Sequence, residues 1–354
     1  MKSSSPSKAV AYFLLVGVAM LIIQVILGGI TRLTGSGLSI TEWNVVTGIV
    51  PPLNEQQWAE EFDKYKASPQ YHLLNSDFTI SNFKSIFFWE WFHRFWARLV
   101  GVVFVVGFVY LIYKRELKNE LIRPLFILFL LGGLQGAIGW IMVVSGLTGD
   151  AIYVNPVRLM VHFIFGLGLI CYAFWVALQL LIPEDQLVVD KPIRRMTFIL
   201  LICLFFQLCY GALMAGYKAA NVAPTWPTIN GDWYPRSMFI NKPLLINFVD
   251  NKITVQIMHR FFAYLIFFLT IAWTFRAYKL VASRTFRQAR WLPMVLVFLQ
   301  VVLGICALLS STGIIANQWV LFDWIALFHQ LVGMLLLLTM IFMLFLLRKQ
   351  GVRL

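Results

Sequence analysis

Eight stretches of this chain are each apolar enough and long enough to cross a lipid bilayer, and this feature constrains the fold more than any other. A helix that crosses the hydrocarbon layer of about 30 Å needs about 20 predominantly apolar residues. Lipid offers no partners to backbone N–H and C=O groups, so such segments have to be helices. We therefore predict an all-α polytopic membrane protein with eight transmembrane helices, at Val10–Ile30, Ile86–Tyr113, Leu125–Val144, Leu159–Ile182, Met196–Tyr217, Ile253–Phe275, Trp291–Leu309 and Phe322–Leu347.

The composition excludes a soluble protein. Of the 354 residues, 60% are hydrophobic and 13% are charged, whereas soluble domains carry roughly 25% charged residues. The net charge of +13 would suggest a nucleic-acid partner in a soluble chain. Here the basic residues lie between the apolar stretches, so membrane orientation explains the charge and no nucleic acid is predicted.

The distribution of Lys and Arg predicts the orientation. Seventeen of the 29 basic residues fall in the termini and in the short connections on the same side, and nine fall on the other side. Basic residues accumulate in cytoplasmic connections, so we expect both termini in the cytoplasm and the two long loops, about Thr31–Ser85 and Lys218–Lys252, outside. The N-terminal segment MKSSSPSKAV resembles neither a removable signal peptide nor an Arg-rich presequence, which favours a bacterial plasma (inner) membrane.

The chain contains an internal duplication. The segment Trp91–Val100 matches Ile257–Ile266 with an offset of 166 residues, and His162 matches His329 with an offset of 167 residues. An even number of spans in each unit gives both units the same orientation, so the repeats are parallel.

We therefore predict two four-helix halves, residues 1–183 and residues 184–354. A Gln-x-x-x-Gly element supports the division, and we align only Gly136 of the third span with it. The element recurs at Gln24/Gly28, Gln207/Gly211 and Gln300/Gly304.

Four of the five histidines lie in spans two, four, six and eight, near the outward ends of the helices: His93, His162, His259 and His329. A lone histidine in such a position is usually a hydrogen-bonding residue. Ionisable groups inside a membrane are costly and usually functional, and four at matched depth in a duplicated frame favour ligation. Each half supplies two imidazoles from two helices, which suits a haem held between helices with one imidazole on each face.

Other interpretations of the histidines stay open at this point. A closed zinc site needs four converging ligands, and no cysteine or acid completes such a set. A proton relay in a transporter does not explain why the histidines pair within each half.

The halves differ beside the first histidine. Glu90 lies one helical turn before His93 on the same face, and the matching residue of the second half, Gln256, cannot ionise. An acid beside one pocket predicts chemistry there, with electron transfer in the second half. The alternative is a carboxylate that pairs with Arg94 or Arg98 in its own helix.

Two arginines, Arg94 and Arg260, directly follow a histidine in each half. They are candidates to contact the propionate groups of a porphyrin, or they are interfacial anchors.

The sequence resembles the haem A synthase family, the Cox15/CtaA-type membrane enzymes of cytochrome oxidase maturation, over nearly its whole length. The most specific matching segment is Gly28–Ser39. The other matching motifs are Glu42-Trp43, Pro51-Pro52-Leu53, Glu90-x-x-His93-Arg94, Ser145-Gly146-Leu147, Ala215–Ala219, Thr225-Trp226-Pro227, His162, His259-Arg260 and His329.

This resemblance implies oxidation of the methyl group of haem O to the formyl group of haem A, through a hydroxymethyl stage. It implies that His259 and His329 ligate a haem b cofactor that moves electrons. It also implies that His93 and His162 hold the iron of the substrate haem, with Glu90 as the catalytic residue at the methyl carbon.

The partners that the resemblance implies are haem O, haem O synthase and cytochrome oxidase assembly factors, within membrane lipid. A homo-oligomer is left open. The alternative functions are a di-haem membrane electron carrier of the cytochrome b type and a transporter with a histidine relay.

Overall fold

The computed structural model describes residues 8–42, 47–315 and 318–349. Trp43 of the family motif and most of the N-terminal segment lie outside these ranges. All regular elements in the described residues are helices, and eight of these are long and apolar enough to span a membrane. The prediction of an all-α membrane protein with eight spans is confirmed.

The eight spans are α1 Lys8–Leu33, α4 Ile80–Tyr113, α5 Asn119–Val144, α6 Pro156–Leu181, α7 Lys191–Gly216, α9 Lys252–Tyr278, α11 Leu292–Ser310 and α12 Leu321–Leu346. The shorter helices are α2 Glu55–Lys66, α3 Pro69–Leu74, α8 Asn247–Asp250 and α10 Arg284–Ala289. Short 3-10 turns lie at Thr47–Ile49, Glu184–Gln186, Ala219–Val222, Arg236–Phe239, Leu244–Ile246 and Ser311–Gly313.

Most of the spans begin earlier than their apolar stretches predict, because polar side chains cap them outside the lipid. Thr79 starts α4, accepting a hydrogen bond from the backbone of Asn82 while the Asn82 side chain accepts one from the Thr79 backbone. Asp190 starts α7 in the same way through the backbone N–H of Ile193, at 2.8 Å. Such side chains satisfy the N–H groups that the first turn of a helix leaves unpaired, so the helix continues beyond the hydrophobic stretch.

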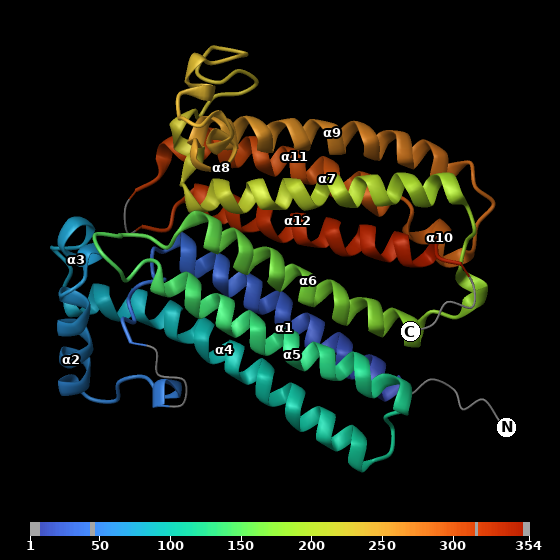
Figure 1. Cartoon of the computed structure of the whole chain (residues 1–354), viewed down its shortest axis with the longest axis horizontal. Coiled ribbons are helices and arrows are strands. Elements are labelled where there is room, and N and C mark those ends of the chain that lie inside the picture. The colour runs from blue at the N-terminus through green and yellow to red at the C-terminus, as the bar shows by residue number, and fades with distance from the viewer. Residues whose placement is uncertain (1–7, 43–46, 316–317, 350–354) are drawn as a thin grey trace.

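The spans lie side by side, with α1, α4, α5 and α6 in one group and α7, α9, α11 and α12 in another (Figure 1). The groups meet where α6 packs against α7 and α12 and where α1 packs against α12. α1 begins and α12 ends at the same end of the bundle, opposite α2, α3 and α8. The boundary between residues 183 and 184 as the limit of two repeats stays a prediction.

The two groups differ in closure. In the second group α9 packs along α11, so that the four helices close into a ring. In the first group α1 packs against α4 and α6, and α5 packs against α6, but α4 and α5 touch only sparsely. Exposed valines along α4, among them Val102, Val105, Val106 and Val109, are suited to lipid.

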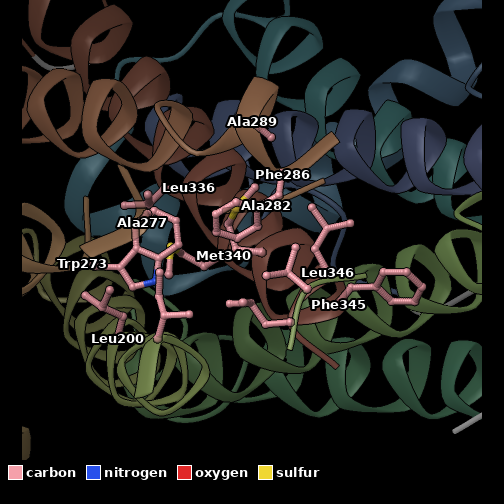
Figure 2. Close-up of a cluster of buried hydrophobic side chains, with 14 of the residues drawn as sticks. Leu200, Trp273, Ala277, Ala282, Phe286, Ala289, Leu336, Met340, Phe345 and Leu346 are labelled. Atoms are coloured by element: carbon pink, nitrogen blue, oxygen red, sulfur yellow. The ribbon is translucent and has the colours of Figure 1, made fainter. Parts of the chain in front are cut away.

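The core of the second group lies near the end of the bundle where α12 ends. Trp273 of α9 is fully buried and donates a hydrogen bond of 2.8 Å to the hydroxyl of Thr197 on α7. Figure 2 shows Trp273 and Phe286 among the aliphatic side chains of this cluster, with Met340 of α12 between them. This packing holds α7, α9 and α12 together at the end of the bundle where α12 ends.

The first predicted loop folds into a cap with its own core. Phe62 and Tyr65 of α2 pack against Phe83 and Phe87 at the start of α4. The rings of Phe62 and Phe83 stack with centres 5.0 Å apart. The sequence predicts only a long outer loop here, and the helices α2 and α3 within it were not predicted.

Candidate functional site

Two imidazole rings face each other between the helices of the second group. His259 lies on α9 and His329 on α12, which occupy opposite corners of the ring of four helices. Their ring centres are 6.2 Å apart and their planes are inclined by 70°. Two imidazoles on opposite sides of one metal ion, each with a metal–nitrogen bond of about 2 Å, have ring centres about 6 Å apart. The pair therefore has the spacing of axial ligands to a single metal ion.

A glutamine and a glycine of α7 lie beside His259. The amide nitrogen of Gln207 is 3.3 Å from Nε2 of His259. A Cβ atom at Gly211 would lie 3.3 Å from Cε1 of the same ring, which is closer than an ordinary carbon contact. The absence of a side chain at Gly211 therefore lets the imidazole approach α7.

The same arrangement occurs between α11 and α12. The amide nitrogen of Gln300 is 3.3 Å from Nε2 of His329, and a Cβ atom at Gly304 would lie 2.9 Å from Cε1 of that ring. A Cβ atom at Gly333 would in turn lie 3.1 Å from the amide nitrogen of Gln300. Each helix thus has a glycine at the point where it contacts the polar side chain of the other helix.

The first group also brings its two histidines together. His93 lies on α4 and His162 on α6, and they are close enough to interact electrostatically. Cβ atoms at Gly28 of α1 and Gly139 of α5 would lie 3.3 Å from Nε2 of His93 and 2.8 Å from Cε1 of His162.

Gln135 corrects the alignment of the third span. Assigning only Gly136 to the Gln-x-x-x-Gly element was wrong, because Gln135 and Gly139 have the required spacing. The Gln135 amide nitrogen lies 3.3 Å from Nδ1 of His162 and donates to the carbonyl of His162 at 3.0 Å. Gln24 donates to the carbonyl of His93 at 3.2 Å. Each of the four histidines therefore contacts one copy of the element on a neighbouring helix.

Glu90 is buried and accepts four hydrogen bonds. Its carboxylate accepts from the backbone N–H of Ser39 at 2.7 Å, the hydroxyl of Ser39 at 2.7 Å and the backbone N–H of Ile40 at 2.9 Å. Arg94 donates to the other carboxylate oxygen at 2.5 Å and to the carbonyls of Ile40 and Glu42, both at 3.2 Å. The ion pair within the helix is thus present, and it fixes the segment that follows α1 against α4.

The second group has a version of this anchor in which an amide replaces the carboxylate. Gln256 donates to the carbonyl of Ala223 at 3.1 Å. Arg260 donates to the carbonyls of Ala223 at 3.2 Å, Thr225 at 2.8 Å and Thr228 at 3.1 Å. Both arginines that follow a histidine therefore hold an outer loop, and the loop in each case follows the helix that carries the Gln-x-x-x-Gly element.

Arg32 joins the two groups and was not identified from the sequence. It lies near the end of α1, and both its Nε, at 3.0 Å, and its Nη2 donate to the carbonyl of Ala215 in the last turn of α7. A cation at this end of a helix also interacts favourably with the helix dipole. Asp323 of α12 interacts with Arg32 electrostatically. An arginine just after an apolar span, as Arg32 follows Val10–Ile30, is a signal that could have identified it.

A small cavity of about 50 Å³ lies between α4, α5 and the segment that follows α1. Arg94 and Glu42 line it together with Trp140 and Leu147. Its volume is well below the range of about 300–1,000 Å³ typical of ligand pockets, so the cavity cannot itself accommodate a porphyrin.

The ring nitrogens and the amide oxygens identify what the site can hold. Among the described residues, no hydrogen-bond partner is found for Nδ1 of His259, Nδ1 of His329 or the buried Oε1 atoms of the four glutamines. Buried polar atoms of this kind are expected to bind something. The described residues contain no group of three or more His, Cys, Asp or Glu side chains that could hold a metal ion. Pairs of imidazoles fit an iron whose remaining ligands come from a macrocycle.

Comparison with known proteins matches the chain to one family over most of its length. The family model for COX15-CtaA, cytochrome oxidase assembly protein, matches residues 11–341. The heme A synthase of Flavobacterium psychrophilum is 38% identical over 94% of this chain and 96% of its own length. The heme A synthases of Bradyrhizobium diazoefficiens and Parvibaculum lavamentivorans are each 40% identical, over 88% and 87% of this chain and 86% and 88% of their own lengths.

Proposed function

Since this chain belongs to the COX15-CtaA family of cytochrome oxidase assembly proteins, we propose that it is a haem A synthase. It is an oxidoreductase of the membrane, and it converts the methyl group of haem O to the formyl group of haem A for cytochrome oxidase assembly. The relatives that match most of the chain carry the name heme A synthase, and the eight apolar helices agree with a substrate dissolved in the bilayer.

The observation that carries this proposal is the spacing of His259 and His329. Ring centres 6.2 Å apart support a resident haem b that His259 and His329 would hold by their imidazoles. When bound, this haem supplies a one-electron carrier within the membrane. The four helices α7, α9, α11 and α12 pack in a closed ring and would hold the two imidazoles in place.

His93 and His162 belong to the substrate site in this proposal. Oxidation of a methyl group removes electrons, so the substrate site needs a route by which they leave, and a haem b held by His259 and His329 would supply that route to an electron acceptor outside the protein. The sparse contact between α4 and α5 supports a site that a membrane-dissolved substrate enters and leaves, whereas the closed ring of α7, α9, α11 and α12 suits a group that stays.

Glu90 holds the substrate side of the site in place. Its four hydrogen bonds support an anchoring role beside His93. A direct part at the methyl carbon requires the carboxylate to release at least one of these donors. Contact of Arg94 or Arg260 with propionate groups likewise requires a guanidinium to share its donors with the loop carbonyls that it now binds.

We assign the protein to the bacterial inner membrane with both termini in the cytoplasm. The excess of basic residues at the termini and short connections supports this orientation. A fluorescent protein fused to the C-terminus should fluoresce, and alkaline phosphatase inserted after Asp232 should be active. A dark C-terminal fusion together with inactive phosphatase would indicate the reverse orientation.

The proposed function is tested by extracting haem from the purified protein. Co-expression with haem O synthase, which the proposal makes the supplier of the substrate, should yield haem O, haem A and haem b. Two equivalents of haem b alone would indicate a di-haem electron carrier, and a protein without visible absorbance would indicate a transporter. His259→Ala and His329→Ala should abolish the low-spin haem b spectrum, whereas the control His72→Ala, on the exposed helix α3, should retain it. If both variants keep the spectrum, the assignment of the two sites is wrong.

A further inference from the structure

The four copies of the Gln-x-x-x-Gly element place a glutamine amide beside each histidine, and the second group makes the most direct use of it. Gln207 and Gln300 each have the amide nitrogen 3.3 Å from a ring nitrogen of the histidine opposite. Neither glutamine lies in an outer loop, and each is one helical turn from the glycine that admits the ring.

The amide oxygens of both glutamines are buried and have no hydrogen-bond partner among the described residues. A buried amide oxygen without a partner is energetically unfavourable. The oxygen and nitrogen of a side-chain amide exchange places when the amide turns by half a rotation. The same group can therefore present a carbonyl oxygen to the ring without any movement of the helices.

An iron-ligating imidazole needs such an acceptor. When one ring nitrogen binds iron, the other keeps its proton, and the partner of that N–H sets the orientation of the ring and its electron donation to the metal. In both His259 and His329 it is Nε2 that faces the glutamine amide. Nδ1 has no partner among the described residues, so Nδ1 would be the nitrogen left for iron and Nε2 would keep the proton.

We propose that Gln207 and Gln300 are positioning residues for the resident haem, each accepting a hydrogen bond from the ring N–H of its ligand histidine through the amide oxygen. This inference rests on the proposed function, because it assumes that His259 and His329 ligate haem iron. By holding the ring N–H, the two amides raise the basicity of the ligands and stabilise ferric over ferrous iron.

The competing acceptor is the backbone carbonyl of the same residue. The backbone of Gln207 lies beside the ring of His259, and the backbone of Gln300 lies beside that of His329. A substitution that removes only the side-chain amide distinguishes the two acceptors.

The test is the midpoint potential of haem b in the purified full-length protein. Gln300→Leu removes the acceptor and should raise the potential, and Gln300→Glu supplies a stronger acceptor and should lower it. Loss of such a partner changes metal affinity by about tenfold or more, and a tenfold change in the ratio of ferric to ferrous affinity corresponds to about 59 mV. Gln207→Leu should act in the same direction, and the double variant should shift the potential further.

Gln330→Leu is the matched control. Gln330 adjoins His329 in the chain, but its amide donates to the carbonyl of Val25 at 3.0 Å on α1, so its removal should leave the potential unchanged.

The outcomes separate this inference from the proposed function. A wild-type protein without a bis-imidazole haem spectrum overturns the proposed function. A wild-type protein with that spectrum, combined with unshifted potentials in the Gln207 and Gln300 variants, assigns the ring N–H groups to the backbone carbonyls and overturns only the inference. If Gln300→Leu fails to accumulate, the shift in Gln300→Glu, which keeps the shape of the side chain, decides the question alone.

Discussion

Gly304 provides the sharpest test of how the helices position a ligand histidine. A Cβ atom added at Gly304 would lie 2.9 Å from Cε1 of His329. Carbon atoms prefer separations of about 3.5–4.0 Å, so in Gly304→Ala the imidazole has to retreat by roughly 0.6 Å. Functional side chains have to be held within about 0.5 Å of their productive geometry. The substitution should therefore displace the ring beyond the tolerance of an axial ligand.

Stability and ligation should respond differently to this change. Alanine is favoured over glycine inside a helix by roughly 0.5–1 kcal/mol. The atom that meets the new methyl group is the end of a side chain that can turn away, so we expect Gly304→Ala to fold with about wild-type stability. Its affinity for haem b should fall by about tenfold or more.

The matched controls are other glycines of the spans. Gly136→Ala meets no atom within 4 Å and should gain the helix preference without losing haem. Gly211→Ala, with a contact of 3.3 Å, should show an intermediate loss. Haem b content by pyridine haemochrome and apparent melting temperature in detergent measure the two effects. Wild-type haem content in Gly304→Ala, or equal losses in Gly136→Ala, would refute the argument.

Two further predictions concern the outer segments. Glu90→Ala should retain bound haem but lose haem A formation. It should also destabilise the protein by about 3–5 kcal/mol, because the charge of Arg94 stays buried after its carboxylate partner is removed. Haem extraction measures the first effect and thermal melting the second, and full haem A formation would remove Glu90 from the mechanism. The cap should loosen in strong alkali, because burial raises the pKa of Tyr65 to about 12, above the value of about 10 expected when unfolded. The contribution of Tyr65 to the free energy of unfolding is therefore constant below pH 10. It falls between pH 10 and 12, since in that range only the unfolded chain loses the phenolic proton. Protease protection of α2 and α3 across this range measures the effect, and an equal loss in Tyr65→Phe would contradict it.

The spans and the histidines could be predicted from the sequence because both depend on local patterns. A run of about 20 apolar residues forms a helix in lipid, because no other structure satisfies its backbone hydrogen bonds there. The number of spans could therefore be predicted without knowledge of how they pack. His93, His162, His259 and His329 were identifiable because a polar residue in an apolar span is rare. The helices α2 and α3 of the outer loop were missed, since their core is assembled from aromatic residues distant from one another in the chain.

The order of the helices and the matched spacing of the four histidines follow from the amino-acid sequence without any knowledge of packing. Which groups meet is visible only once the helices are packed. His259 and His329 face each other 6.2 Å apart, Gln135 contacts His162, and Arg32 reaches from α1 to the end of α7. The physical reason is that hydrophobicity and helix geometry act along the chain, whereas hydrogen bonds between spans depend on which helix faces which. A glycine destabilises an isolated helix, but between two packed helices it leaves the space that a ligand side chain occupies.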